Sequence, residues 1–531
     1  MKTIKTQLKE TIKKSLDKTD FPAAVSFVVN YPRISQYGDY STNVAMIIAK
    51  QLRKPPLEIA GELVKILQKQ RFIKDMFEKV ESIKPGFINF YFSPTFLSKQ
   101  VSAILSLKDD YGKSDLGKKQ KVQIEFISAN PTGPLTIGNG RGGFYGDVLG
   151  NVLEKCGFKV IKEYLINDAG QQIEKLGHSV LQDNQAVYRG EYIDDLHNRL
   201  KGESDPYKVG QKAAKIILTQ LIKPTVEKQM QIKFDRWFSE EKELRKTKKI
   251  TEVLNWLKEK KYLYEKDNAW WFRSSDFGDN RDRVLIKQDG GSTYLAQDFA
   301  YLKNKFAERK FVTVIDIWGA DHHGEVAGLL NAAKALGYKD QQKIILLQFV
   351  RLTKEGKEVR MSKRTGSYIT MSELIETVGH DVARFFFLMY SPNSHIDFDM
   401  DLALEKSEKN PVYYVQYAFA RLSSILNQPQ VTSHFKKSPA ALDYNQTEEY
   451  TLIKEVIKWP EILEEAASLY QVQLLPAYAI SLADRFHQFY NNCRVINNDA
   501  INVSRVELVK LMRKIFLEVL STIGVSAPEK M

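Results

Sequence analysis

The segment VQIEFISANPTGPLTIGNGRGGFYGDVLGNVLEKCGFKVIKEYLINDAGQQ, from Val122 to Gln172, decides the fold of this chain. Its first residues, Val122–Ile127, are rich in β-branched and aromatic side chains and predict a buried strand. The prolines and the glycine of Asn130–Pro134 end that strand. Apolar residues then recur at helical spacing over Phe144–Cys156, and Phe158–Ile166 predicts the next strand. The order of strand, glycine-rich turn, helix and strand indicates the first half of a nucleotide-binding α/β unit.

The glycines at 138, 140, 142 and 143 favour an anion beside the turn that we expect there. Glycine lets the backbone approach a ligand closely, and the first turn of a helix presents free N–H groups and a positive dipole end. Gly138-x-Gly140-x-x-Gly143 fits the dinucleotide-binding fingerprint, and Glu163 follows at the distance of a ribose-binding acid. On the local pattern alone, a dinucleotide site, another phosphate site and a purely structural tight turn all stay open.

Length and composition indicate a protein of several domains. The chain has 531 residues, which is too many for one hydrophobic core, and we expect two to four domains. Hydrophobic residues make up 43% and charged residues 27% of the chain, as in ordinary globular proteins. The net charge of +13 suits a polyanionic partner, but it is spread along the chain and also fits a merely basic surface.

Cysteine usage and hydropathy point to the cytoplasm and away from a membrane. The two cysteines, Cys156 and Cys493, lie far apart in sequence, which excludes a disulfide framework and a cysteine-rich zinc site and fits a reducing compartment. No apolar run approaches the roughly 20 residues that span a bilayer. The first residues, MKTIKTQLKETIKKSL, predict an amphipathic helix rather than a signal peptide.

Alternating strands and helices predict three parts. Residues 1–115 read as an N-terminal α/β module, and residues 116–375 as a doubly wound parallel sheet with a helical insertion at about 173–285. Within the sheet, Phe311–Trp318 and Ile344–Phe349 are further expected strands. From residue 376 to 531 the apolar residues recur three and four positions apart, which predicts a helical bundle. The helices expected in it are Arg384–Tyr390, Pro411–Asn427, Glu448–Ser468, Leu474–Asn492 and Val503–Ile523.

Ligands of a doubly wound sheet bind at the carboxyl ends of its strands. We expect three loops to leave the sheet at that edge, namely residues 130–143, 319–325 and 358–366. The third contains Arg360-Met-Ser-Lys-Arg-Thr-Gly366, whose Lys363 could move onto a triphosphate as negative charge develops there. Hydride transfer has no use for such a loop, although a solvated basic turn would look the same when taken singly.

Joined to residues 129–139, ANPTGPLTIGN, this loop resembles the two signature motifs of class I aminoacyl-tRNA synthetases. A longer set of segments resembles the arginyl-tRNA synthetase family: EFISANPTGP from Glu125, INDAGQQ from Ile166, DGGSTY from Asp289, GADHHG from Gly319 and GVSAPEKM from Gly524. The resemblance runs from about Tyr40 to Met531. It implies a class I Rossmann-like catalytic sheet, an N-terminal module that contacts the tRNA elbow, and a C-terminal anticodon-binding bundle.

The resemblance implies an arginine–tRNA ligase. Such an enzyme activates L-arginine with ATP to arginyl-adenylate and pyrophosphate, and then transfers the arginyl group to the 3′-terminal adenosine of tRNA(Arg). ATP is the expected cosubstrate with Mg²⁺ as its counter-ion, and no tightly bound metal is expected. We further expect a cytoplasmic monomer without membrane contact. Catalysis would come from positioning and from charge stabilisation, without a protein nucleophile.

The same resemblance assigns roles to individual residues. Those expected to take part in catalysis are Lys363, Ser362, Met361, Thr136 and Asn139. Those expected at ATP are Pro131, Thr132, Gly133, Pro134, Gly138, Gly140, Gly319, Asp321, His323 and Arg360. Those expected at arginine are Glu125, Ser128, Asn130, Tyr294, Asp298 and His322, because a guanidinium needs carboxylate acceptors in a confined site. Those expected at tRNA are Tyr413, Tyr417, Tyr490, Arg494 and Met531.

Both signature motifs depart from the family pattern, at three positions in total. The first motif commonly has histidine where this chain has Thr136 and Asn139, and a threonine hydroxyl cannot supply an imidazolium charge to the phosphates. The second motif opens with Arg360 in place of the usual lysine. Arg141 or Arg360 could compensate for the missing histidine charge. The departures leave two alternatives to an active ligase: a non-catalytic tRNA-binding paralogue and a dinucleotide-dependent oxidoreductase.

Overall fold

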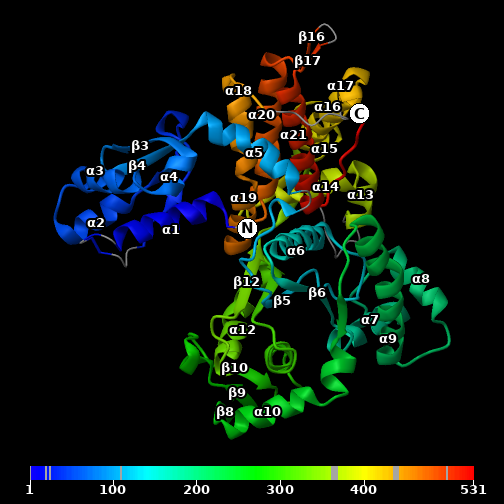
Figure 1. Cartoon of the computed structure of the whole chain (residues 1–531). Helices are drawn as coiled ribbons and strands as arrows, with labels where there is room; N and C mark the ends of the chain where they lie inside the picture. The colour runs from blue at the N-terminus through cyan, green and yellow to red at the C-terminus, as the bar shows by residue number, and fades with distance from the viewer. Residues whose placement is uncertain are drawn as a thin grey trace.

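The computed structural model describes residues 2–17, 19, 21–22, 26–107, 110–359, 369–434, 442–497 and 500–531. Three bodies make up the molecule (Figure 1). The N-terminal module, in blue, lies to one side of the C-terminal helical bundle, in orange and red. The catalytic sheet and its insertions lie below the bundle.

A five-stranded parallel sheet forms the centre of the catalytic body. Its strand order is β12-β11-β5-β6-β7, and every neighbouring pair is parallel, which confirms the predicted doubly wound sheet. Parallel strands are covered on both faces, which agrees with their nearly continuous apolar sequences. The strands are β5 (Lys121–Glu125), β6 (Lys159–Ile166), β7 (Arg236–Ser239), β11 (Thr313–Gly319) and β12 (Gln342–Leu347).

Helix α6 (Ile137–Lys155) connects β5 to β6 and corrects one prediction. It begins at Ile137 rather than at Phe144, so the glycines from 138 to 143 lie inside its first turns and do not form a turn before it. None of these glycines has a positive φ. At two of them the structural reason is close packing, because a Cβ on Gly140 would lie 2.1 Å from Met371 Sδ, and a Cβ on Gly143 would lie 2.5 Å from Met230 Cε.

The region from 173 to 285 is less helical than expected. Strand β7 belongs to the main sheet, and β8, β9 and β10 form a separate antiparallel sheet in the order β10-β9-β8. A second apolar core lies between this small sheet and its flanking helices. The elements are α7 (Gln171–Leu181), α8 (Glu191–Arg199), α9 (Pro206–Ile217), α10 (Lys249–Glu259), β8 (Leu263–Lys266), β9 (Ala269–Phe272), β10 (Arg283–Ile286), α11 (Tyr294–Lys303) and α12 (His323–Ala335).

The loop at 358–366 does not leave the main sheet as predicted. It follows β14 (Lys357–Glu358), which pairs with β13 (Val350–Lys354) in a small sheet of order β14-β13-β15. Arg360, Met361, Ser362 and Lys363 lie outside the described residues. Beyond them the chain lies beside the segment that precedes α6, because Thr370 forms a β-bridge with Thr136 and the Met371 amide donates to the Leu135 carbonyl at 2.9 Å.

The C-terminal body is a helical bundle, as predicted. Helices α20 (Leu474–Asn492) and α21 (Val503–Ile523) have the predicted bounds. The helix expected over Glu448–Ser468 is divided in two at Lys458, because Pro460 starts a new helix in its first turn. The other elements are α13 (Met371–Val378), α14 (His380–Leu388), β15 (Ile396–Asp399), α15 (Met400–Leu404), α16 (Pro411–Leu426), α17 (Pro429–His434), α18 (Thr447–Ile457), α19 (Trp459–Leu469) and the hairpin β16 (Ile496–Asn497) and β17 (Ala500–Ile501).

The N-terminal module is a four-stranded antiparallel sheet with helices against it. Its strand order is β1-β2-β4-β3, and β3 is a strand that the sequence pattern did not reveal. Helix α5 leads out of the module and packs on α18 and α21 of the bundle (Figure 1). The elements are α1 (Ile4–Leu16), β1 (Val29–Asn30), β2 (Tyr40–Thr42), α2 (Val44–Leu52), α3 (Pro56–Leu67), α4 (Arg71–Met76), β3 (Phe77–Ile83), β4 (Phe87–Phe92) and α5 (Pro94–Ser106).

A buried carboxylate on α19 joins the module to the bundle. Glu461 accepts hydrogen bonds from the Tyr31 hydroxyl, from the Tyr40 hydroxyl at 2.8 Å and from the Lys5 amide at 2.7 Å. Burial raises the pKa of Glu461, which these hydrogen bonds partly offset. An ion pair at 2.8 Å between Lys454 and Asp39 lies at the same junction. The two bodies therefore share specific polar contacts in addition to one continuous apolar core.

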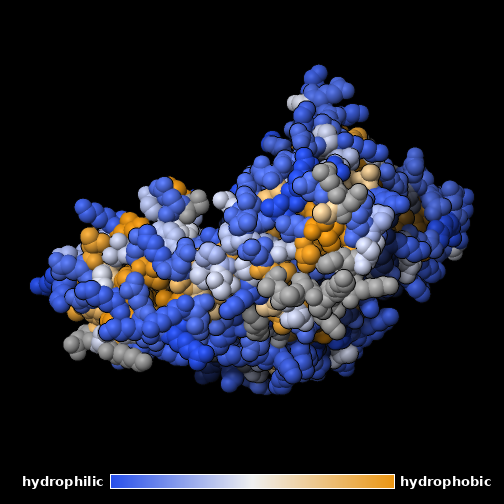
Figure 2. Space-filling model, turned by 45° about the horizontal axis from the view of Figure 1, so that its top comes forward, coloured by the Kyte–Doolittle hydropathy of each residue, from blue (hydrophilic) through white to orange (hydrophobic). Residues whose placement is uncertain are grey.

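The surface is mostly hydrophilic, with small apolar areas between the charged side chains (Figure 2). Several large apolar side chains of the N-terminal module are exposed, among them Val28, Ile34, Tyr37, Leu57 and Phe87. Among the helices that the structure describes, none combines the length and the apolar composition that crossing a bilayer requires.

Candidate active site

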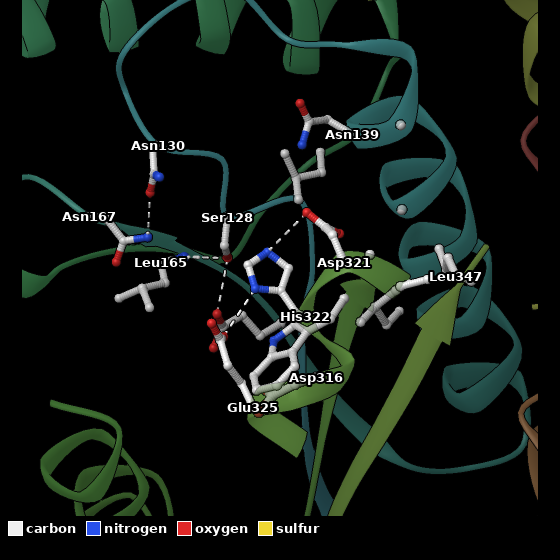
Figure 3. Close-up of a pocket in the computed structure, with 18 of the residues that line it drawn as sticks. Ser128, Asn130, Asn139, Leu165, Asn167, Asp316, Asp321, His322, Glu325 and Leu347 are labelled. Carbon is white, nitrogen blue, oxygen red and sulfur yellow. Dashed lines mark hydrogen bonds and ion pairs between the residues drawn. The ribbon is translucent and has the colours of Figure 1, made fainter. Parts of the chain in front are cut away.

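A cavity of about 650 Å³ opens at the carboxyl edge of the parallel sheet (Figure 3). Its walls are the segments that follow β5, β6, β11 and β12, the first turns of α6 and one face of α11. Ligand sites of doubly wound folds lie at this edge, where strands turn into helices. The loops at 130–143 and 319–325 both reach the cavity, as predicted from the sequence.

The chain turns sharply where β5 ends. Ile127 and Ser128 have φ values of 65° and 37°, which L-residues rarely adopt and which are costly for a β-branched side chain. The turn lets the Ser128 hydroxyl donate to Glu125 Oε1 at 3.1 Å, while Ser128 Oγ accepts from the Leu165 amide at 3.0 Å. Strain at this point therefore fixes two of the predicted arginine-site residues against each other.

Asn130 lies in the cavity beside a residue that the sequence analysis did not select. The side-chain amide of Asn167 donates to Asn130 Oδ1 at 3.0 Å, and both side chains line the cavity (Figure 3). Asn167 belongs to INDAGQQ, one of the segments that carry the family resemblance, but the sequence analysis assigned no role to Asn167 itself.

Thr136 and Asn139 cap α6 at the cavity. The Thr136 hydroxyl accepts from the Asn139 amide, and the Asn139 side chain accepts from the Thr136 amide at 3.0 Å, which makes a reciprocal capping box. Such a cap holds the first turn of the helix open to an anion, because its free N–H groups and dipole end face the ligand. Thr136 therefore has a structural role as the N-cap of α6, although it supplies no charge to a phosphate.

Arg141 does not supply that charge either. Its guanidinium is buried and donates to the carbonyls of Gln348 and Ser391, the latter at 2.8 Å. Burial lowers the pKa of Arg141 to about 10. Its contacts hold the segment after β12, where Gln348 and Phe349 line the cavity.

One face of α11 forms a wall of the cavity. Tyr294 and Asp298, which are one turn apart, both line it, and Tyr301, Leu302 and Lys305 follow on the same face. Tyr294 is 63% exposed and lies at the rim. The predicted pair is therefore in place for joint contact with one ligand.

Five carboxylates line the cavity, and four of them have a basic neighbour: Glu125, Asp316, Asp321 and Glu325. Lys305 Nζ lies 2.7 Å from Glu125 Oε2 and 3.0 Å from Asp316 Oδ1. His322 lies 3.1 Å from Glu325 and 3.8 Å from Asp321. Among the described residues, no basic group lies within ion-pair distance of Asp298, which is the fifth.

The environment of Asp298 disfavours its charged form. Burial raises the pKa of Asp298 well above its usual value, and the negative charges of Glu125, Glu325 and Asp316 raise it further. A bound cation would restore the charged form by direct pairing. Perturbed carboxyl groups of this kind cluster at functional sites.

The segment after β11 brings three predicted residues to the cavity and leaves one outside. Gly319, Asp321 and His322 line it, whereas His323 is exposed at the start of α12 and does not. The hydrogen bond with Glu325 raises the pKa of His322, so its imidazole carries more charge near neutral pH than a free histidine. Glu325 itself was not predicted.

Residues 131–134 and Gly140 also lie outside the cavity lining. The Tyr192 hydroxyl donates to the Thr132 carbonyl at 3.0 Å, and a Cβ on Gly133 would lie 3.1 Å from the same hydroxyl. Thr132 and Gly133 therefore lie against Tyr192 of α8, and Pro131 and Pro134 flank them in the chain. Gly140 faces Met371 instead, as described above.

Sequence reasoning missed several lining residues, namely Asn167, Tyr301, Lys305, Asp316, Trp318, Glu325, Gln348 and Phe349. Most of them lie in strands or helices whose sequences look like ordinary core. Asp316 and Lys305 could have been suspected, because an acid inside the apolar strand sequence Phe311–Trp318 must have a partner when it is buried.

Glu163 rules out the dinucleotide interpretation of the glycine pattern. It is buried on β6, where its carboxylate accepts from Arg309 at 2.8 Å, from Tyr301 at 2.5 Å and from Gln123 at 2.8 Å. An acid enclosed in this way cannot bind a ribose. The glycines meanwhile lie inside α6, so both parts of the fingerprint have structural roles.

A second group of predicted residues lies far away on the bundle. The rings of Tyr413 and Tyr417 stack with centroids 6.4 Å apart, and Tyr417 also stacks on His487 at 6.1 Å. Arg421 donates to the Tyr417 hydroxyl at 3.0 Å and lies over the Tyr490 ring. Aromatic rings and arginines in one row can stack on unpaired bases of RNA. Arg494 and Met531, also predicted at tRNA, are exposed.

The described residues contain no group of three histidine, cysteine, aspartate or glutamate side chains arranged to hold a metal ion. Four of the five cavity carboxylates are paired with basic groups instead.

Three family models match the chain in succession. They are the arginyl tRNA synthetase N-terminal domain over residues 3–92, the class I (R) tRNA synthetase catalytic domain over residues 100–384, and the DALR anticodon-binding domain over residues 415–531. The catalytic match ends within α14, and the anticodon-binding match begins within α16.

Full-length relatives agree with the family models. The arginine–tRNA ligase of Carboxydothermus hydrogenoformans is 42% identical over 96% of this chain and 94% of its own length. That of Geobacillus thermodenitrificans is 40% identical over 99% of both chains. The solved arginyl-tRNA synthetase of Thermus thermophilus has the same fold, with a TM-score of 0.77 over 100% of both chains at 20% identity.

Proposed function

The chain belongs to the arginyl-tRNA synthetase family and is an arginine–tRNA ligase, and we propose that the cavity at the sheet edge binds arginine and ATP side by side. Enzymes of this class join an amino acid to tRNA at the expense of ATP. The α-carboxylate of arginine attacks the α-phosphate of ATP, which gives arginyl-adenylate and releases pyrophosphate. A ribose hydroxyl of the terminal adenosine of tRNA(Arg) then takes the arginyl group, and AMP leaves.

The observation that carries the site assignment is Asp298. It is a carboxylate without a basic partner among the described residues, in a cavity whose other four carboxylates have one. A guanidinium ion is the ligand that such a site lacks, because it offers planar paired donors to a carboxylate. Tyr294, one turn away at the rim, would close over the guanidinium.

The remaining roles follow from the positions of the side chains around Asp298. Ser128, Asn130 and His322 line the same cavity and would hold the α-amino and α-carboxyl end of arginine. The first turn of α6, with Thr136, Gly138 and Asn139, would receive the phosphates. Gly319 and Asp321 would lie near the adenosine. Lys363, with Met361, Ser362 and Arg360, would approach the triphosphate from the loop that returns at Thr370.

The rest of the molecule would bind tRNA. We propose bodies at residues 1–115, 116–375 and 376–531, with the aromatic row of the bundle reading the anticodon and the N-terminal module contacting the tRNA elbow. Mg²⁺ would enter as the counter-ion of ATP. The enzyme would act as a monomer in the cytoplasm, where translation consumes charged tRNA.

The test is aminoacylation by the purified full-length chain. Radiolabelled arginine, ATP and a tRNA(Arg) transcript should give acid-precipitable arginyl-tRNA, and pyrophosphate should exchange into ATP when arginine and tRNA are both present. Lysine and citrulline, which lack the charged guanidinium, should give at least about 100-fold less product.

Two outcomes would contradict the proposal. Binding of tRNA without exchange or aminoacylation would indicate the non-catalytic paralogue, in which Thr136 has replaced a required histidine. Full activity of an Asp298→Asn variant would show that the guanidinium binds elsewhere.

A further inference from the structure

Phe349 is a large apolar ring at the cavity to which the proposed function assigns no role. Among the described side chains that line the cavity, only Tyr294 and Phe349 are large, apolar and exposed, at 63% and 55%. Tyr294 is assigned to the guanidinium above. An apolar ring that stays in contact with water at a ligand site favours a flat ligand, because covering the ring removes its surface from water.

The backbone that carries this ring is held by hydrogen bonds on both sides. Only Gln348 and Phe349 connect β12 to β13. The Gln348 amide donates to the Pro392 carbonyl at 3.0 Å, and the Ile396 amide donates to the Phe349 carbonyl at 3.1 Å. The Gln348 carbonyl also accepts from the buried guanidinium of Arg141 on α6. The ring is therefore presented by a short, fixed connection and not by a long loop.

His395 gives Phe349 a parallel neighbour. The centroids of the two rings lie 6.4 Å apart, and their planes are inclined by 18°. His395 directly precedes β15 and is itself exposed. Because Phe349 remains 55% exposed beside this neighbour, more than half of its surface can still receive a second flat group.

The position of Phe349 in the sheet places it beside the proposed sites for adenosine and phosphate. Gly319 at the end of β11 pairs with Leu347 at the end of β12, so the segments that lead to Asp321 and to Phe349 leave the sheet next to each other. Leu347 in turn lies beside α6, where a Cβ on Gly142 would be 3.9 Å from Leu347 Cδ1 (Figure 3). A ligand with phosphates on the first turn of α6 can therefore reach the ring.

We propose that Phe349 is a stacking platform for the adenine base of ATP. This inference rests on the proposed function of the cavity and adds a binding residue to it. The phosphates would lie on the first turn of α6, the ribose near Gly319 and Asp321, and the base on the ring of Phe349. Every base has a π-face, so the ring supplies affinity, and selection of adenine over other bases must come from groups at the edge of the base.

Two substrates carry an adenine, ATP and the 3′ end of tRNA, and the geometry favours ATP as its source. In ATP the adenosine is joined directly to the α-phosphate, so its base lies within one ribose of the phosphate site. The terminal ribose of the tRNA must instead reach the arginyl carbon. Glu125, which is expected at arginine, ends β5, and β11 separates β5 from β12. The tRNA base would thus approach from the arginine side of the cavity.

Substitution of Phe349 should weaken the binding of ATP through its base and not through its phosphates. Phe349→Ala should raise ATP KM and the inhibition constant of adenosine about tenfold or more, as expected for the loss of one stacked ring. Phe349→Tyr keeps the ring and should retain the wild-type values, whereas the apolar but non-aromatic Phe349→Leu should lie between the two. Inorganic tripolyphosphate, which has no base, should inhibit the wild type and Phe349→Ala equally. The assay is pyrophosphate exchange at saturating arginine and tRNA.

A tryptophan at this position would report stacking directly. A base that stacks on an indole quenches its fluorescence, so ATP should quench Phe349→Trp more strongly than the wild type, whose six tryptophans give the background. Tripolyphosphate should produce no such difference. In the absence of ATP, tRNA(Arg) with and without its terminal adenosine should quench Phe349→Trp to the same extent.

Phe87→Ala is the matched control. Phe87 on β4 is 37% exposed and lies outside the cavity, so the same change there should leave ATP KM unchanged. Thermal midpoints show whether each variant is folded. If Phe349→Ala does not fold, Phe349→Leu and the fluorescence of Phe349→Trp still decide the question.

Three results would overturn the proposal. They are a wild-type ATP KM and adenosine inhibition in Phe349→Ala, an equal loss of affinity for tripolyphosphate and adenosine, and a rise in tRNA KM without a rise in ATP KM. All three leave the proposed function standing, provided the wild type forms arginyl-tRNA. A wild type that forms none would instead contradict the proposed function itself.

Discussion

Asp298 shows how a single side chain can define a substrate. The neighbouring carboxylates of the cavity have basic partners from the protein, whereas Asp298 has none among the residues that the structure describes, and in our proposal its partner is the substrate. Binding is strongest where the ligand satisfies a group that is otherwise costly to bury. The cavity thus selects for a cation by leaving one carboxylate unsatisfied.

Replacing Asp298 by asparagine should therefore abolish most of the arginine affinity. The change keeps the size of the side chain but removes its charge, and we expect arginine KM to rise about 100-fold, equivalent to about 2.7 kcal/mol. The fall in kcat/KM at acid pH should also disappear, because the raised pKa belongs to this group. Steady-state aminoacylation between about pH 6 and 8 measures both effects.

The matched control is Asp276→Asn. Asp276 is an exposed acid on η6 (Ser274–Phe277) outside the cavity, and the same chemical change there should leave arginine KM unchanged. An unchanged KM in the Asp298→Asn variant would place the guanidinium elsewhere.

Thr136 provides a second test at the level of one residue. Thr136→Ala removes the N-cap of α6 and should cost about 1 kcal/mol of unfolding free energy. Loosening the first turn should also weaken ATP binding, because that turn is the proposed phosphate site. Thr136→Ser keeps the hydroxyl and should retain stability and ATP KM. Urea unfolding and ATP KM measure the two effects, and equal behaviour of both variants would exclude the capping role.

Helix α6 illustrates what the glycines of the signature segment do at the level of an element. A Cβ on Gly146 would lie 2.3 Å from the ring of buried Phe126, whereas a Cβ on Gly142 would meet nothing closer than Leu347 at 3.9 Å. Gly146→Ala should thus destabilise the protein by about 1–3 kcal/mol. Gly142→Ala should stabilise it by up to about 1 kcal/mol, because alanine favours the helix. Chemical denaturation measures the unfolding free energy of both variants, and so compares a glycine without room for a Cβ with a glycine that has room for one in the same helix.

The elements themselves were largely predictable, since periodic apolar residues mark them. Helices α20 and α21 were predicted with their observed bounds, and four of the five strands of the central sheet within a few residues, whereas β7 was missed. The start of α6 was wrong because glycine pointed to a turn, while the real determinant is contact with Met371, Met230 and Phe126 from distant segments. Contacts of that kind leave no local signal.

The candidate site was predictable only in part, for a similar reason. Tyr294 and Asp298 could be paired because they are one helical turn apart. Lys305, by contrast, reaches the same cavity through a π-turn and is held by Asp316 from another strand. The spacing of Lys305 and Asp316 along the sequence follows neither a helical nor a strand period, so their pairing becomes visible only in the folded structure.

At the scale of the whole molecule, Glu461 holds two bodies together. Glu461→Ala would leave the buried hydroxyls of Tyr31 and Tyr40 without their acceptor, which should cost about 2 kcal/mol and loosen the N-terminal module from the bundle. Hydrogen exchange should then accelerate in α1 and β2, and tRNA KM should rise while arginine KM stays constant.

Lys454→Met is the control for this junction. The substitution removes the ion pair between Lys454, which is 36% exposed, and Asp39. It should change the hydrogen-exchange rates little, because exposed ion pairs contribute about 0–1 kcal/mol to stability. Equal exchange in the two variants would mean that apolar packing alone holds the module.

The contacts at this junction can form only late in the synthesis of the chain. Tyr40 and its partner Glu461 are 421 residues apart, and translation at about 5–20 residues per second separates their synthesis by roughly 20–80 s. During that interval the nascent N-terminal module exists without the surface that covers its tyrosines. The first part of the chain to leave the ribosome is therefore among the last to reach its final position.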